Sequence, residues 1–221
     1  MASCEVPLVA TQAAFAIARA AGACTVLNPA PACPLPIELL AKIDAVAQAA
    51  MKGRGGRIVA KMHALTDQAL IAALLRAGYA GAKIDFIVRG ACMLPAQLPP
   101  NIRVRSIIGR FLEHSRVFYF RAGADEQLWL SSADWMNRNM LRRIELAWPV
   151  TDPVLRQRII DECLLAYLHD EALSWQMRAD NSYQRTNAPF DTPKNVQKAL
   201  MDRYRNDTQT LQDTKKKIKN K

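Results

Sequence analysis

Residues 111–116 carry the sharpest chemical signal in the 221-residue sequence, because a histidine stands there between an acid and a predicted strand. Histidine gives or accepts a proton near neutral pH, and its ring nitrogen can attack phosphorus. His114 is therefore a candidate catalytic residue. The residues alone also allow a structural role, in which Glu113 satisfies the ring within a loop.

A second candidate, Arg89, follows an apolar segment that we predict to be a buried strand. Because α/β folds bind ligands at the C-terminal ends of parallel strands, an arginine at this place can reach an anion. Gly90 would let the backbone approach that anion closely. The residues alone leave open whether Arg89 instead bridges a neighbouring loop.

Arginine is concentrated between residues 101 and 143, where eight arginines and no lysine are opposed by four acids. Arginine can bind phosphate through two parallel hydrogen bonds, so this composition favours a phosphate ligand. Residues 130–139 add hydroxyl and amide donors that can line such a site. Trp135, in the same segment, is by itself more typical of a core.

Four further features are interpreted as structural rather than functional. His63 and His169 are interpreted as structural or exposed residues, and residues 142–145 as arginines paired with a carboxylate on a strand. Residues 53–56 are rich in glycine but lack the length and the Lys-Ser/Thr pair of a phosphate-binding loop.

The formal net charge of +10 predicts an anionic partner, and nucleic acid, a membrane surface and polyphosphate all satisfy it. Residues 215–221 contain five lysines and no acid, which predicts a solvated, disordered end.

The number of cysteines is five, which is odd, and no two cysteines are in CxxC spacing. This pattern fits a reducing cytoplasm better than disulfides or a zinc site. No apolar run is long enough for a transmembrane helix, and the apolar first 23 residues lack the basic start of a signal peptide.

The hydrophobic pattern predicts an α/β fold. Strand, helix and strand over residues 56–88 imply a right-handed parallel crossover. We expect helices at residues 11–22, 36–50, 67–78, 152–169 and 193–205, and strands at residues 56–62, 85–88, 102–108, 115–120, 127–131 and 143–149.

Residues 43–205 resemble the last domain of the long, multi-domain bacterial polyphosphate kinases. The resemblance rests on long motifs in the family's order, which lie at residues 57–62, 83–92, 101–116, 130–139, 142–145 and 197–204. Such enzymes transfer the terminal phosphoryl group reversibly between ATP and inorganic polyphosphate through a phosphohistidine. Their two C-terminal domains each look like half of a phospholipase D, so the resemblance implies a mixed sheet flanked by helices, with an N-terminal helical appendage.

The resemblance also implies roles for particular residues. Arg89 matches the family's nucleotide-phosphate arginine, and His114 matches a second active-site histidine that contacts the nucleotide and acts as general acid or base. Arg116, Ser132 and Asn139 join them as expected nucleotide- or phosphate-binding residues. The phosphorylated histidine and the groups that bind Mg²⁺ belong to the family's preceding domain, so we expect no metal ligands in this chain.

The chain departs from the family pattern at two places. His63 stands where the family usually has asparagine. The loop at residues 93–100 is a few residues shorter, which would change the position of Arg89 relative to His114.

The first 42 residues resemble one βα unit of a ribokinase-type sugar kinase, through residues 4–7, an Ala-rich helix and residues 25–32. We therefore expect three parts: a ribokinase-like fragment at 1–47, the polyphosphate kinase domain at 48–207, and a basic disordered tail at 208–221.

The expected function is that of a polyphosphate kinase, with ATP or ADP and polyphosphate as substrates. Because the phosphohistidine domain is not in this chain, we expect the chain to be inactive alone. The alternatives are a non-catalytic remnant that binds ATP or polyphosphate, a homo-oligomer, and a subunit completed by a partner with the missing half. No specific nucleic-acid partner is expected, and the expected compartment is the cytoplasm.

Overall fold

The computed structural model describes residues 35–186 and 194–219. The chain divides into two compact units between Cys33 and Pro34, and every element below belongs to the second. The helix predicted at residues 11–22 and both ribokinase-like motifs lie outside the described residues.

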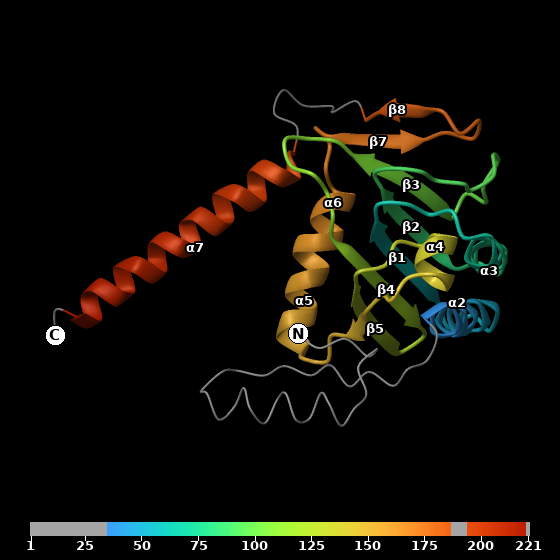
Figure 1. Cartoon of the computed structure of the whole chain (residues 1–221), viewed down its shortest axis with the longest axis horizontal. Coiled ribbons are helices and arrows are strands. Elements are labelled where there is room, and N and C mark those ends of the chain that lie inside the picture. The colour runs from blue at the N-terminus through green and yellow to red at the C-terminus, as the bar shows by residue number, and fades with distance from the viewer. Residues whose placement is uncertain (1–34, 187–193, 220–221) are drawn as a thin grey trace. The chain divides into compact units, whose positions relative to one another are not determined.

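A mixed sheet of eight strands in the order β6-β5-β4-β1-β2-β3-β7-β8 forms the centre of this unit (Figure 1). β1, β2 and β3 are parallel, and every other neighbouring pair is antiparallel. The strands are β1 (Gly56–Met62), β2 (Lys83–Val88), β3 (Ile102–Ile107), β4 (Arg116–Ala122), β5 (Asp125–Ser131), β6 (Ala147–Pro149), β7 (Ser174–Met177) and β8 (Tyr183–Arg185). The expected α/β class and the parallel β1–β2 crossover are confirmed.

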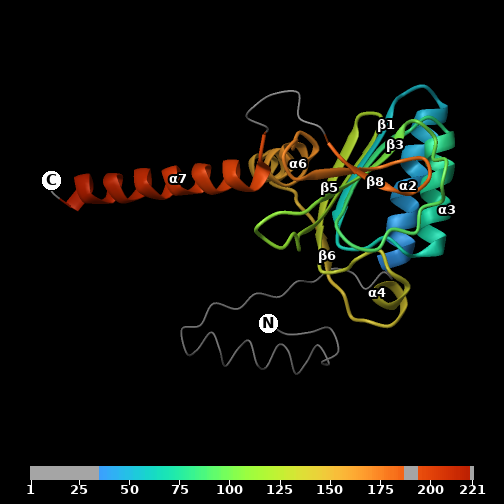
Figure 2. The same ribbon diagram turned by 90° about the horizontal axis from the view of Figure 1, so that it is seen from above.

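Helices cover both faces of the sheet (Figure 2). α2 (Leu35–Met51) and α3 (Gln68–Tyr79) lie on one face, and α5 (Pro153–Ile159), the π-helical turn η1 (Ile160–Leu165) and α6 (Ala166–Leu168) lie on the other. The short α4 (Asn137–Leu141) follows β5, and α7 (Val196–Lys219) comes last. Within the described ranges, no helix has the length and apolar character to cross a bilayer.

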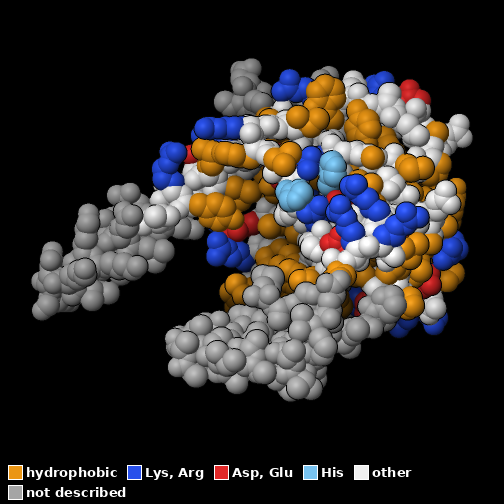
Figure 3. Space-filling model, in the orientation of Figure 1, with side chains coloured by type: hydrophobic (Ala, Val, Ile, Leu, Met, Phe, Trp, Pro, Cys, Tyr) orange, Lys and Arg blue, Asp and Glu red, His pale blue; other side chains and the backbone are white. Residues whose placement is uncertain are grey.

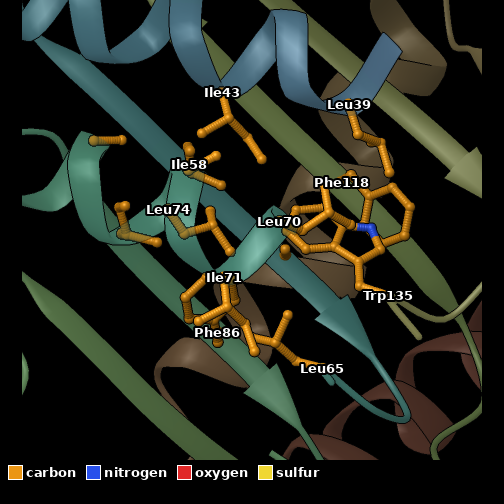
Figure 4. Packing of buried hydrophobic residues seen from close by; sticks show 14 of the residues in the cluster. Leu39, Ile43, Ile58, Leu65, Leu70, Ile71, Leu74, Phe86, Phe118 and Trp135 are labelled. Carbon is orange, nitrogen blue, oxygen red and sulfur yellow. The ribbon is translucent and has the colours of Figure 1, made fainter. Parts of the chain in front are cut away.

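The main core lies between the sheet and α2 and α3 (Figure 4). Alternate residues of β1 point to opposite faces, so Ile58 and Met62 join this core while Lys61 points to the face that bears α6. Trp135 is fully buried in the core, with its ring centroid 5.0 Å from that of Phe118 and 6.4 Å from that of Phe86. The interpretation of Trp135 as a core residue is confirmed.

Several bounds differ from the predicted ones. Only residues 147–149 of the segment 143–149 form a strand, because pairing with β5 ends at Ala147. The helix expected at 152–169 contains the π-helical turn η1. α7 continues past the expected end at Arg205 as far as Lys219, into the segment predicted to be a disordered tail. Lysine, glutamine and leucine in that segment are good helix formers, which the charge pattern alone did not weigh.

The boundary expected after residue 47 falls inside α2. Leu39, Ile43 and Val46 of this helix are buried in the main core, so α2 is part of the second unit rather than of the N-terminal fragment.

Replacing Ile43 tests this assignment. Ile43→Ala leaves a cavity in the main core and should lower the free energy of unfolding by about 2–5 kcal/mol. Ile37→Ala, on the exposed side of the same helix, should change it by less than about 0.5 kcal/mol. Denaturant unfolding of the full chain measures both, and equal effects would show that α2 does not pack on the sheet.

Candidate functional site

The candidate site lies at the C-terminal ends of β1 and β2, where segments distant in sequence are tied together by backbone hydrogen bonds. The Gly90 amide donates to the His63 carbonyl (2.9 Å), and the Leu65 amide donates to the Ala91 carbonyl (2.9 Å). The Trp135 amide donates to the Ala64 carbonyl (3.1 Å). These bonds hold the loops after β1, β2 and β5 side by side.

Asp134 fixes these loops from within. Its Oδ1 accepts hydrogen bonds from the amides of His63 (2.7 Å) and Ala64 (3.4 Å). Arg116 donates to both carboxylate oxygens, with Nε 3.1 Å from Oδ1 and Nη2 2.8 Å from Oδ2. Burial alone would raise the pKa of Asp134, but the hydrogen bonds and charge of Arg116 and the two amides outweigh burial and lower it.

Arg89 and His114 meet at this edge of the sheet. Nε of Arg89 donates to the carbonyl of Glu113, and Nη2 of Arg89 lies 3.5 Å from Nδ1 of His114. A guanidinium can only donate, so a hydrogen bond at this contact requires the lone pair of Nδ1 on His114. The His114 carbonyl accepts a bond from Nη1 of Arg116 at 3.1 Å. The short loop at 93–100 therefore does not separate Arg89 from His114.

His63, which the sequence analysis interpreted as structural or exposed, lies beside Arg89 and Gly90 at this edge of the sheet. A methyl group on Gly90 would lie 2.7 Å from Nδ1 of His63, so the absence of a side chain at Gly90 makes room for the imidazole. Burial and the nearby Arg89 lower the pKa of His63, with Arg116 and His114 adding to this effect against Asp134. The signal that could have found it is its place directly after a parallel strand, the same argument that singled out Arg89.

Ser132 and Asn139 form a separate cluster around Glu145. The Ser132 hydroxyl donates to one oxygen of the Glu145 carboxylate, and the Asn139 amide donates to the other. Oγ of Ser132 also accepts from the Leu146 amide at 2.9 Å. Among the described residues, no hydrogen bond joins this cluster to Arg89 or His114. Glu145 thus binds these donors instead of the arginines that the sequence suggested.

The charges at the site favour an anion. Basic side chains gather beside histidine side chains on the face shown in Figure 3. The neighbouring acids are already engaged, since Asp134 is bound to Arg116 and Glu113 to Lys61. No cluster of three or more metal-binding side chains occurs among the described residues. The site can therefore hold a phosphate and move a proton, but its donor set does not fit Mg²⁺.

Comparison with known proteins decides the family. Residues 31–217 match the family described as "Polyphosphate kinase C-terminal domain 2". The chain belongs to this family.

Two similar proteins are both polyphosphate kinases. The polyphosphate kinase of Paraburkholderia phytofirmans is 48% identical over 170 residues, which are 76% of this chain and 25% of that protein. The polyphosphate kinase of Burkholderia cenocepacia is 46% identical over 169 residues, which are 75% of this chain and 24% of that protein. The chain thus spans about a quarter of the length of these relatives.

A solved polyphosphate kinase structure, from Porphyromonas gingivalis, is also similar, with a TM-score of 0.76 and 30% identity over 90% of this chain and 31% of that one. The resemblance that the motifs indicated is confirmed. The family match begins at residue 31 rather than near residue 43, which places α2 inside the polyphosphate kinase domain.

Asp134 gives the site a testable dependence on pH. Its pKa in the folded chain lies below the ordinary value of 3.8, so the unfolded chain binds more protons between the two pKa values. The stabilisation is complete above pH 3.8 and is lost as the pH falls through the folded pKa.

Asp134→Asn should remove that acid-dependent part of the stability curve. At neutral pH it should also lower the free energy of unfolding by about 3 kcal/mol, because Arg116 loses its buried partner. Denaturant unfolding from pH 2.5 to 7 provides the measurement. Asp161→Asn, an exposed control, should leave the curve unchanged; a wild-type slope in Asp134→Asn would contradict the assignment.

Proposed function

We propose that this chain supplies one half of a polyphosphate kinase active site, and that its half binds phosphate groups of ATP, ADP and polyphosphate. The observation that carries the proposal is the contact between Arg89 and His114 at the C-terminal ends of parallel strands, with no free carboxylate beside it among the described residues. This place in the sheet and this set of donors suit an anionic ligand.

In this proposal Arg89 binds a phosphate group directly. Only its Nε is used by the Glu113 carbonyl, so the Nη groups keep donors for phosphate oxygens. His114 is exposed and acts as the proton donor or acceptor beside the bound phosphate. The reaction is reversible transfer of the terminal phosphoryl group of ATP to polyphosphate.

Arg116, Ser132 and Asn139 complete the proposed binding set from supporting positions. Arg116 adds positive charge while Asp134 holds its guanidinium. Ser132 and Asn139 offer a hydroxyl and an amide, and binding of a phosphate there requires that Glu145 withdraw. A negatively charged ligand would favour that withdrawal because like charges repel.

The residues that complete the reaction come from outside this chain in the proposal. The chain spans about a quarter of its relatives' length, and the phosphohistidine and any Mg²⁺ site are assigned to the remaining part. A complementing subunit would supply them, and a homo-oligomer of this chain is the alternative assembly. The polyphosphate kinase domain is assigned to residues 48–207 together with α2. The chain is assigned to the cytoplasm, where ATP and ADP are present.

A second candidate is a non-catalytic domain that binds ATP or polyphosphate. Formation of ATP from ADP and polyphosphate by the purified chain separates the candidates. We expect none from the chain alone, and turnover only when a relative lacking its own last domain is added. If the chain binds neither polyphosphate nor nucleotide, both candidates are wrong.

The role of Arg89 can be measured by binding. Arg89→Ala should weaken binding of fluorescent polyphosphate about ten-fold or more, the effect of a charge-assisted hydrogen bond worth about 1.5–3 kcal/mol. Arg121→Ala removes the same charge from an exposed position further along β4 and should have a small effect. Equal losses in the two variants would show that only net charge matters.

A further inference from the structure

Glu113, the residue before His114, is buried although it is charged. Its side chain is 9% exposed. One carboxylate oxygen is 2.7 Å from Nζ of Lys61, and the other accepts a hydrogen bond from Nε2 of Gln197 at 2.6 Å. A buried carboxylate needs such partners, because burial without them would be costly.

The side chain of Gln197, in the first turn of α7, also forms hydrogen bonds with the backbone of this loop. Its Oε1 accepts from the Phe111 amide at 3.0 Å, and its Nε2 donates to the Phe111 carbonyl at 2.8 Å. A Cβ on Gly109 would lie 2.5 Å from Oε1 of Gln197, so the loop lies flush against this side chain. Gln197 is 6% exposed, and its hydrogen bonds are thus shielded from water.

Lys61 is held in place from a third direction. Its Nζ lies 3.4 Å from the centre of the Tyr167 ring on α6. Burial, and after it the charge of Glu113 and a hydrogen bond to Glu113, raise the pKa of Tyr167, so its hydroxyl stays protonated and can donate to Glu113. Strand β1, helix α6 and helix α7 therefore converge on one carboxylate.

An open groove of about 270 Å³ lies beside this carboxylate, between Phe111 and Leu112 on the loop and Leu200 and Tyr204 on α7. Across this groove, Gln197 exchanges hydrogen bonds with the loop at Phe111 and Glu113.

We propose that Gln197 and Lys61 are positioning residues, which fix the backbone of Glu113 and thereby hold His114 against Arg89. The side chain of Glu113 is bonded to Lys61 on β1 and to Gln197 on α7, and its carbonyl accepts a hydrogen bond from Arg89. Both the side chain and the backbone of Glu113 are therefore fixed. This proposal rests on the proposed function in one respect, namely that polyphosphate binding should depend on these contacts of Glu113. Docking of α7 is thus a condition for a formed site.

Gln197→Ala tests the positioning role in the full chain. The chain has three histidines, so their ring resonances can be separated by nuclear magnetic resonance. We expect the His114 resonances to shift and broaden as its loop is released, while those of His169 stay in place. Lys198→Ala is the matched control, because Lys198 is exposed on the same turn and pairs with Asp202 of its own helix.

A second substitution at the same position supplies an independent test. Gln197→Glu keeps the size of the side chain but replaces the amide that donates to Glu113 and to the Phe111 carbonyl. It places a second carboxylate beside Glu113, so the His114 resonances should be disturbed at least as much as in Gln197→Ala. Thermal unfolding reports whether each variant folds, and either folded variant decides the test.

The outcomes separate this proposal from the proposed function. Unchanged His114 resonances in folded Gln197→Ala, or in folded Gln197→Glu, would overturn the positioning role whatever the chain binds. If the wild-type chain binds no polyphosphate, the proposed function fails while the resonance experiment still decides the positioning role. If both hold, Gln197→Ala should weaken polyphosphate binding about five-fold, the worth of roughly one hydrogen bond.

Discussion

The buried ion pair between Lys61 and Glu113 is the constraint on which the site depends. Burial lowers the pKa of Lys61, and the facing carboxylate opposes that effect. Neither charge is tolerable at this depth alone, so β1 and the loop before β4 must be brought together for either to be buried. The same carboxylate accepts a hydrogen bond from Gln197 of α7, and the ring of Tyr167 on α6 lies against Nζ of Lys61. Elements far apart in the chain therefore acquire fixed places around the residue that precedes His114.

Asp134 plays the corresponding part on the other side of the site. It accepts hydrogen bonds from two amides of the loop after β1 and from Nε and Nη2 of Arg116, so its negative charge is balanced inside the protein. Both carboxylates are paired with basic side chains inside the protein, so the described acids nearest to Arg89 and His114 are already engaged. The preference of this edge for an anion follows from that arrangement rather than from the net charge of the chain.

The fold was predictable to the extent that it is local. Apolar runs and helical spacing predicted β1, α3 and β2 with their parallel order, and the place of Arg89 after β2 predicted that it lies at the C-terminal ends of these strands. His114 gained its assignment from the family motif, because a single histidine in a loop does not reveal its partners. Pairings between distant residues escaped the sequence: Glu145 with Ser132 and Asn139, and Gln197 with a loop 84 residues before it. Side-chain partners of this kind depend on where the sheet brings the loops, which no spacing rule contains.

Arg89 connects the two halves of this arrangement. Its Nε bond to the Glu113 carbonyl is inside the protein, whereas its Nη2 faces His114 at 3.5 Å, a distance at which the contact is weak. A phosphate bound by the Nη groups would replace that weak contact with stronger charge-assisted bonds and leave the Nε bond intact. Under the proposed function, phosphate binding would therefore leave the Glu113 anchor in place and release Nδ1 of His114 from the guanidinium. The ion pair between Lys61 and Glu113 would keep the loop in place while the Nη groups of Arg89 exchange His114 for the phosphate.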